Sequence, residues 1–421
     1  MRAQQPHSCC FSAFGSIALA LLFALTLTSC KNKNSGAPDL ALVGATLYAS
    51  PTATPVEDAV VLVHNGKIAE IGKRGEVKIP ESDTVIDCTG KAITAGFWNS
   101  HVHFTEDVWN NAASARASQL EPHMQEMLTR WGFTTVFDLG SNPMSTGGLR
   151  GRIADGDLAG PRIFMAADIF PKNGIPSYLP KNANLPQAGT PTEARALAIE
   201  DLASGADAMK LFTGSYQGEN PVINMPEGVV KAAVGVAHAQ GKPVFAHPQN
   251  HVGVDNALAG GVDVLAHTIP GEGQYTSEEL ARMKVQHTAL IPTLTLWEVE
   301  AEKEHTSAAA EQRFVQAGVN ELKTYFDQGG TILFGTDVGY QHRYDTTEEY
   351  LLMAKSGMTW RDILASLTKN PATFFKAGHT GEIAEGDAAD LVVLSADPAA
   401  DVRNFAKVDY TIRAGKVIYQ K

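Results

Sequence analysis

The side chains best suited to chemistry are histidines, a lysine and an aspartate spaced through the middle of the chain. His101 and His103 are one residue apart, and alternate side chains of a strand leave the same face, so this pair can share one metal ion. Four further candidates each come at or near the end of a short apolar run: Lys210, His247, His267 and Asp337. Any one of them alone would have an ordinary structural explanation, such as a packed core histidine. Together, imidazole and carboxylate groups predict a metal site.

The elements that must position these side chains alternate between strand-like and helix-like segments. The expected strands are residues 101–104, 134–139, 162–167, 208–212, 243–247, 262–267, 289–294 and 331–337. Helix start signals separate them, such as Thr190 followed by Pro191 and Glu193, a capping box with proline at the first helical position. Eight such units over roughly 280 residues match a (β/α)₈ TIM barrel, whose catalytic residues lie at the carboxyl ends of the strands. A doubly wound open sheet is the alternative, but no glycine-rich phosphate fingerprint follows any strand.

The two ends of the chain have a different texture, with short β runs and turn signals. One example is Asn65-Gly66, a dipeptide typical of a tight hairpin. We therefore expect an α/β protein in which residues 40–96 plus 380–421 form a small β-sandwich domain. Residues 97–379 would form the barrel.

The first residues resemble a bacterial lipoprotein signal. An apolar run over 14–27, too short to span a membrane as a stable helix, ends in Leu27-Thr28-Ser29-Cys30. We expect a signal peptide over 1–29, lipidation of Cys30 and a flexible tether over 30–39. The protein would then be a periplasm-facing lipoprotein of the cell envelope, held to a membrane by its lipid. An ordinary secretory signal, giving a soluble secreted or periplasmic protein, is the alternative.

Composition narrows the class of protein. The chain has 421 residues, 44% of them hydrophobic and 19% charged, which is typical of a globular protein. Its formal net charge of -12 argues against a nucleic-acid partner, because phosphate binding needs clustered lysine and arginine. Neither the substrate nor the oligomeric state can be read from these numbers.

Two longer motifs link the candidates to a known family. They are Gly96-Phe97-Trp98-Asn99-Ser100-His101-Val102-His103 and, near the end, Asn370-Pro371-Ala372 followed by Gly386-Asp387-Ala388-Ala389-Asp390-Leu391-Val392-Val393-Leu394. With the strand-end ligands, they resemble the amidohydrolase superfamily, in its imidazolonepropionase-like and prolidase-like branch. The resemblance implies that one divalent ion is bound by His101, His103 and Asp337, and a second by His247 and His267. It also implies that Lys210 bridges both ions as a carbamate formed with CO₂.

The same resemblance implies hydrolysis of a carbon–nitrogen bond in a small amide, cyclic amide, peptide or N-acyl amino acid. A hydroxide bridging the two ions would be the nucleophile, and Asp337 would act as general base and then general acid. Zinc is the default ion for a histidine-rich site, with Mn, Co or Fe as alternatives. Tyr216 would hold a carboxylate or carbonyl of the substrate.

Three other functions stay open. A mononuclear deaminase or imidazolone-type ring-opening hydrolase is the nearest, although Lys210 weighs against it because those branches usually lack the bridging lysine. A lactonase or esterase would use the same nucleophile. A non-catalytic barrel scaffold would have no physical need for a costly cluster of buried polar groups.

Overall fold

The computed structural model describes residues 39–180 and 184–421. The expected signal peptide over 1–29, the lipidation site Cys30 and all but the last residue of the tether over 30–39 lie outside this range. Within the described part of the chain, no helix is both long and apolar enough to cross a membrane.

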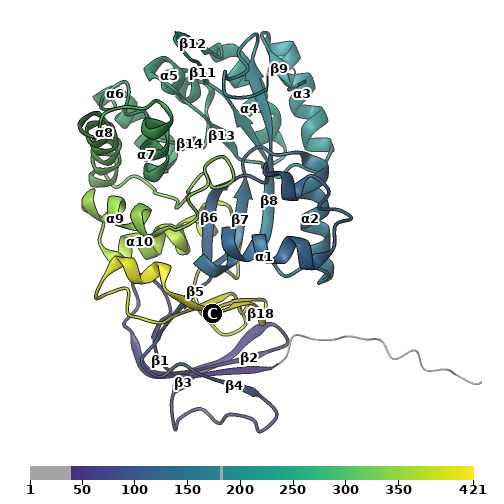
Figure 1. The fold of residues 1–421 in the computed structure, drawn as a ribbon, viewed down its shortest axis with the longest axis vertical. Helices are drawn as coiled ribbons and strands as arrows, with labels where there is room; N and C mark the ends of the chain where they lie inside the picture. The colour runs from purple at the N-terminus through teal and green to yellow at the C-terminus, as the bar shows by residue number, and fades with distance from the viewer. Residues whose placement is uncertain (1–38, 181–183) are drawn as a thin grey trace, which may run out of the picture. The chain divides into compact units, whose positions relative to one another are not determined.

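Parallel strands form the central barrel (Figure 1). Their order in the sheet is β15-β14-β13-β10-β8-β7-β6. Their bounds are β6 (Phe97–Val102), β7 (Phe133–Asp138), β8 (Arg162–Pro171), β10 (Ala208–Leu211), β13 (Val244–Ala246), β14 (Val264–Ala266) and β15 (Ala289–Ile291). These strands are buried along nearly their whole length, as expected for parallel strands covered by helices on the outside. The expected TIM-barrel fold is confirmed.

The eighth position of the barrel is filled by an irregular segment rather than by the regular strand expected over 331–337. Isolated bridges join Ile332 to Leu290 of β15 and Val338 to Val102 of β6, so the segment still closes the ring between its neighbours. The backbone of Asp337 has φ of 60°, outside the extended region, which interrupts the ladder at that residue. The sequence therefore predicted the position of this segment correctly, but the segment is not a regular strand.

Helices follow most strands and cover the barrel. Their bounds are α1 (Ala117–Met127), α2 (Pro143–Asp155), α3 (Pro191–Ala203), α4 (Glu227–Ala239), α5 (His251–Gly260), α6 (Ser277–Gln286), α7 (Leu294–Lys303), α8 (Ala308–Asp327), α9 (Thr347–Lys355), α10 (Trp360–Leu367) and α11 (Lys369–Phe374). The capping box expected at Thr190 and Glu193 is present at the start of α3. Shorter elements are β9 (Gln187–Ala188), the hairpin of β11 (Gly214–Gln217) and β12 (Asn220–Asn224), and 3-10 turns over 107–109, 129–131 and 402–406.

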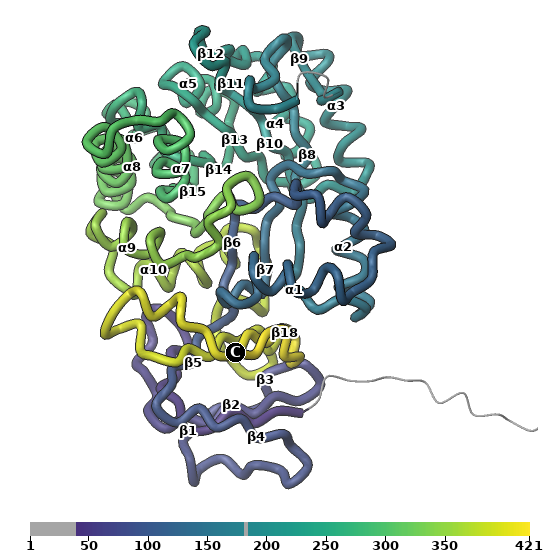
Figure 2. The backbone as a smooth tube through the Cα atoms, in the orientation of Figure 1, coloured from purple at the N-terminus to yellow at the C-terminus, as the bar shows by residue number. Residues whose placement is uncertain are grey.

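Strands from both ends of the chain pair into a separate β domain, as Figure 2 shows where the purple and yellow segments meet. The strands are β1 (Leu40–Tyr48), β2 (Val56–His64), β3 (Lys67–Lys73), β4 (Thr84–Asp87), β5 (Ala92–Ala95), β16 (Leu391–Leu394), β17 (Val408–Arg413) and β18 (Lys416–Gln420). All are hydrogen-bonded into one sheet, and the link between the two chain ends is the antiparallel pairing of β5 with β16. The sheet curls over its own apolar core, so that Ile68 N donates to Asp387 O at 2.9 Å. The Asn65-Gly66 turn joins β2 to β3 as expected, with positive φ at both residues.

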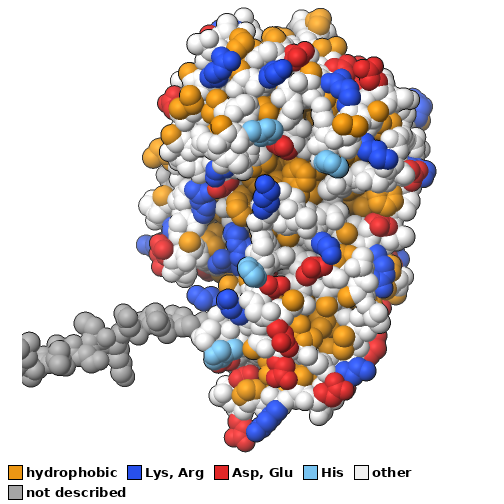
Figure 3. Space-filling view, turned by 180° about the vertical axis from the view of Figure 1, so that it is seen from behind, with side chains coloured by type: hydrophobic (Ala, Val, Ile, Leu, Met, Phe, Trp, Pro, Cys, Tyr) orange, Lys and Arg blue, Asp and Glu red, His pale blue; other side chains and the backbone are white. Residues whose placement is uncertain are grey.

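Charged side chains of both signs are interspersed on the face of the molecule in Figure 3. Neither lysine and arginine nor aspartate and glutamate form a continuous field on that face.

Candidate metal centre

All six candidate ligands line one cavity of about 600 Å³ at the carboxyl ends of the barrel strands. His101 lies within β6 and His103 directly after it; Lys210 lies in β10. His247 and His267 directly follow β13 and β14. The rule that barrel enzymes place their catalytic groups at this end therefore holds for the whole set.

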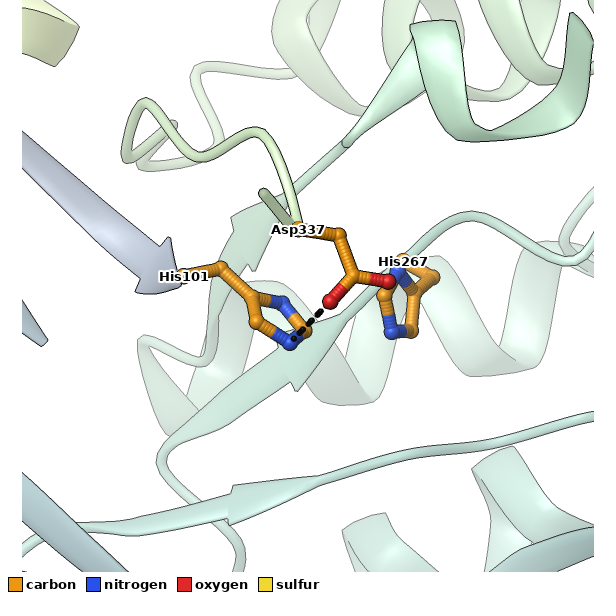
Figure 4. Close-up of side chains that lie close together, drawn as sticks. All are labelled: His101, His267 and Asp337. Carbon is orange, nitrogen blue, oxygen red and sulfur yellow. Dashed lines mark ion pairs between the residues drawn. The ribbon is translucent and has the colours of Figure 1, made fainter. Parts of the chain in front are cut away.

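The tightest group in the cavity consists of His101, His267 and Asp337, whose ligand atoms lie within 4.8 Å of one another. In Figure 4 the Asp337 carboxylate points between the two imidazole rings. Asp337 Oδ1 is 3.1 Å from His101 Nε2 and 2.9 Å from His103 Nε2, and these two nitrogens are 3.2 Å apart. The rings of His247 and His267 are 4.8 Å apart, centroid to centroid. The cavity thus gathers the ligands expected for both ions, while the division of the ligands between two ions stays a prediction.

Hydrogen bonds behind the rings turn the Nε2 lone pairs of His103 and His267 toward this group. His103 Nδ1 donates to Gly140 O at 2.9 Å. His267 Nδ1 lies 2.6 Å from Thr293 Oγ1, which itself donates to Pro292 O and so accepts from the ring. With the proton of each neutral ring held at Nδ1, Nε2 is an electron-pair donor. Electron-pair donors that converge on a carboxylate need a cation between them, so the set fits a divalent metal ion.

Burial gives these groups the protonation states that metal binding requires. Burial, reinforced by the charge of Lys210, lowers the pKa of His101 and of His247 to about 3. Burial and the neighbouring His101 hold the pKa of His267 well below its usual range. For Asp337 burial acts in the opposite sense, but the adjacent His101 and His103 hold the pKa of its carboxyl well below its usual range. Neutral imidazoles beside an ionised carboxylate are the states a metal ion binds.

Backbone strain is concentrated at the same place. His267, Thr293 and Asp337 have positive φ values of 80°, 44° and 60°, a region that side chains with a Cβ rarely adopt. Each such residue costs on the order of 1–3 kcal/mol, which persists only where the surroundings fix it. With these backbone conformations, His267 and Asp337 both line the cavity.

Two glycines allow loops to approach the histidines closely. Gly339 has φ of 100°, and a Cβ there would lie 1.8 Å from His103 O. A Cβ on Gly140, whose carbonyl orients His103, would lie 2.2 Å from the carboxylate of Asp168. A larger residue at position 339 would displace the backbone of His103, and one at position 140 would displace the side chain of Asp168.

Asp138, at the end of β7, supports the centre from behind. Its carboxylate accepts hydrogen bonds from Ser141 Oγ and Thr146 Oγ1, each at 2.7 Å. Ser141 Oγ accepts from Phe104 N at 2.7 Å, which ties this loop to the segment after His103. Asp138 therefore both stabilises the loop after β7 and supports the segment that follows His103.

Sequence reasoning missed two residues, one that supports a ligand from behind and one that lines the cavity. Thr293 was expected inside a strand over 289–294, whereas β15 ends at Ile291 and Thr293 precedes α7. Asp168, in β8, lines the cavity, and burial raises the pKa of its carboxyl to about 7. Its place beside Lys210 on the neighbouring strand follows only from the register of the sheet, which no local pattern gives.

Tyr216 also lines the cavity, as expected of a substrate contact. Its hydroxyl donates to Glu304 Oε1 at 3.1 Å. The phenol proton is therefore directed at a carboxylate of the protein.

Known proteins resemble this chain over most of its length. The ochratoxinase of Aspergillus niger is 23% identical over 413 residues, covering 86% of this chain and 83% of that protein. Its crystal structure has a TM-score of 0.74 at 19% identity, covering 91% of this chain and 96% of that chain. A Bifidobacterium longum protein described as a prolidase has a TM-score of 0.76 at 25% identity, covering 91% and 95% of the two chains. An uncharacterized protein of Mycobacterium tuberculosis is 28% identical over 179 residues, which span 41% of this chain and only 46% of that relative.

The profile of the Amidohydrolase family matches residues 92–418, a stretch that contains the barrel, all six candidate ligands and most of the C-terminal β segment. A prolidase-like structural neighbour agrees with the branch that the sequence motifs resemble. This chain belongs to the amidohydrolase family.

Proposed function

We propose that this protein is a dinuclear metal-dependent amidohydrolase that hydrolyses the carbon–nitrogen bond of a small amide, cyclic amide, peptide or N-acyl amino acid. The observation that carries the proposal is the convergence of four imidazoles, an ionised carboxylate and a buried lysine on one cavity. The similarity to an ochratoxinase and to a protein described as a prolidase supports it.

The ligand sets follow from the family resemblance and from the contacts above. His101, His103 and Asp337 would hold one ion, and His247 and His267 the other, with zinc as the default metal. When bound, the ions supply an activated water as nucleophile and a Lewis acid for the scissile carbonyl. Residues of the chain carry out the other steps.

Asp337 is placed to move the proton. Its carboxylate is almost fully buried and ionised, and it adjoins the Nε2 atoms of His101 and His103. In the proposed reaction it takes the proton of the attacking water and passes it to the leaving nitrogen. Phe212 and Trp297 give the cavity apolar walls around this centre.

Lys210 is proposed to bridge the two ions as a carbamate. The residue is 1% exposed, and burial lowers the pKa of its amine to about 8. A buried ammonium is costly, and the uncharged amine is the form that adds CO₂. The new N–C bond replaces an N–H bond, the proton leaves to solvent, and the product is an anion whose two oxygens would hold the ions.

The test is the metal content of purified protein, compared with that of a Lys210→Ala variant and with hydrolysis of a panel of small amides. We expect about two ions per chain, falling together with activity in the variant. Lys231→Ala, on the exposed side of α4, is the matched control and should change neither quantity. One ion per chain, unaffected by Lys210→Ala, would instead indicate a mononuclear deaminase or ring-opening enzyme, and no ion would indicate a scaffold. Faster turnover of lactones than of any amide would indicate a lactonase or esterase.

We also propose that Cys30 carries a lipid that anchors the enzyme to a membrane of the cell envelope, facing the periplasm. The support is the sequence pattern that ends in Leu27-Thr28-Ser29-Cys30. Labelling of cells with a radioactive fatty acid should mark the protein but not a Cys30→Ala variant. An unlabelled protein found free in the periplasm or medium would favour an ordinary secretory signal.

A further inference from the structure

The walls of the cavity carry carboxylates but no basic side chain of their own. Among the described residues that line it, Lys210 is the only lysine or arginine, and it belongs to the metal centre. Outside that centre the lining includes Asp168, Glu300 and Glu304. A group of the substrate that extends from the scissile bond toward α7 therefore meets negative charge.

Glu300 and Glu304 are four residues apart at the end of α7, so they lie on the same face of the helix. Each accepts a phenol proton from a residue of another segment: Tyr340 OH donates to Glu300 Oε1 and Tyr216 OH, in β11, to Glu304 Oε1, both at 3.1 Å. The phenols fix the two carboxylates over the cavity. The Oε2 atom of each makes no hydrogen bond with the described residues.

Lys303 lies beside Glu300 and offsets only part of the charge of this wall. It pairs with Glu300 Oε1 at 2.8 Å and lies over the ring of Tyr340, 4.0 Å from the centroid, and it is not part of the lining. Its side chain is 46% exposed, and exposed pairs of this kind contribute little. Glu304 has no such partner among the described residues.

Aromatic side chains also line the cavity beside these glutamates. Trp297 and Phe314 pack edge to face at 5.5 Å, and Phe212 stacks on His247 at 4.8 Å, each pair measured between ring centroids. Aromatic faces attract a cation and offer an apolar surface to a neutral ring, whereas they give nothing to a carboxylate. The wall and its two glutamates therefore favour the same kind of ligand.

We propose that the cavity selects amides with an apolar or aromatic body and a positively charged end directed at Glu300 and Glu304, and that it rejects substrates with a free anionic group at that end. That the ligand is an amide substrate rests on the proposed function, whereas the charge preference rests on the residues of the wall. A carboxylate at the same place would lie beside two like charges, and the described residues that line this wall include no lysine or arginine to pair with it.

Binding tests the charge preference without any need for turnover. The probes are 4-methylbenzylammonium and 4-methylbenzenesulfonate, titrated calorimetrically into the metal-loaded protein. We expect the ammonium to bind at least about tenfold more tightly, with a difference that shrinks at high salt. In a Glu300→Gln/Glu304→Gln double variant the ratio of the two affinities should fall toward one. Glu304→Gln alone, at an exposed position, should lower it part of the way and serves if the double variant does not fold.

Two further variants sharpen the result. Glu302→Gln removes a carboxylate from the same helix that pairs with Arg343 outside the cavity, and it should leave the ratio unchanged. Lys303→Gln removes the outer cation and should raise the ratio. Equal or tighter binding of the sulfonate, or a ratio that survives the double variant, would overturn the inference.

Hydrolysis separates this inference from the proposed function. The substrates are acetanilides whose para substituent is aminomethyl, hydroxymethyl or sulfomethyl, so that only the charge at the far end changes. We expect kcat/KM to fall in that order. Preference for the ammonium in binding, with none of the three anilides hydrolysed, would support the charge selection and count against amide hydrolysis as the activity.

Discussion

The floor and the wall of the cavity are built in different ways. The floor consists of the six candidate metal ligands, on or directly after barrel strands, and four of them, His101, Lys210, His267 and Asp337, are between 1% and 4% exposed. The wall, by contrast, has its polar groups at the end of α7 and on the β11–β12 hairpin: Tyr216 and Glu300 are half-buried and Glu304 is exposed. Rigid strand ends hold the groups that would do the chemistry, and adaptable segments hold those that would choose the substrate. If this division is right, changes to the floor should affect turnover and metal binding, and changes to the wall should affect selectivity.

The largest expected effect comes from Asp337→Asn, which keeps the shape of the side chain but removes its ability to accept a proton. General acid–base catalysis typically contributes about 10²–10⁴-fold, so kcat should fall at least by that factor. Steady-state kinetics with the best amide of the panel measures it, alongside metal content. Asp327→Asn, whose side chain is 53% exposed on α8, is the matched control and should retain full activity. A kcat within tenfold of the parent would show that the proton moves through another group.

A smaller effect is expected from Thr293→Val, which deletes the hydroxyl that accepts from His267 Nδ1. Valine is β-branched like threonine, so the strain of the positive φ at this position is nearly matched and the hydrogen bond is the main loss. Groups that orient a metal-binding histidine typically contribute about 10–100-fold to metal affinity or activity. Competition with a chelator of known affinity measures the loss.

Thr192→Val, in the exposed first turn of α3, is the control for this change and should bind metal as the parent does. Unchanged affinity in Thr293→Val would mean that the backbone alone orients His267. The floor would then depend on strand geometry rather than on its hydrogen-bonded surroundings.

The floor was largely predictable from sequence and the wall was not. Alternation places His101 and His103 on one face, and apolar runs place His247 and His267 at strand ends, because both signals are local. The eighth strand was expected to be regular because its pattern is apolar, but the positive φ of Asp337 breaks it. No local pattern reports such strain, which depends on contacts with distant residues.

The wall depends on contacts between segments far apart in the chain. Tyr216 was expected to hold a substrate, yet its hydroxyl reaches Glu304 across the cavity. The start of α7 is likewise fixed from a distance, because the buried carboxylate of Glu349 accepts from Leu294 N at 2.9 Å and Thr295 N at 2.8 Å. Pairings of this kind become visible only once the fold is known.

The smallest predicted effect concerns Glu321 of α8, a fully buried acid that supports the floor from outside the cavity. Its Oε2 accepts from Ile269 N at 2.7 Å, two residues beyond His267. Burial raises the pKa of this carboxyl from its ordinary value of 4.5 to about 8. Between those values the folded protein keeps a proton that the unfolded chain has lost. The free energy of unfolding therefore decreases as pH rises through this window, by up to about 1.4 kcal/mol per pH unit.

Glu321→Gln should remove this dependence, because the amide keeps an acceptor for Ile269 N and mimics the protonated acid. We expect the variant and the parent to unfold at similar denaturant concentrations at pH 5, and the variant to be the more stable at pH 8 by about 1 kcal/mol or more. The difference between the two proteins at the two pH values isolates this carboxyl from every other titrating group. If the gap does not widen with pH, Glu321 is ionised in the folded protein and its charge is compensated locally. If it widens, ionisation of the carboxyl that accepts from Ile269 N, close to His267, makes the folded protein less stable in alkali, and the floor depends on a buried proton outside the cavity.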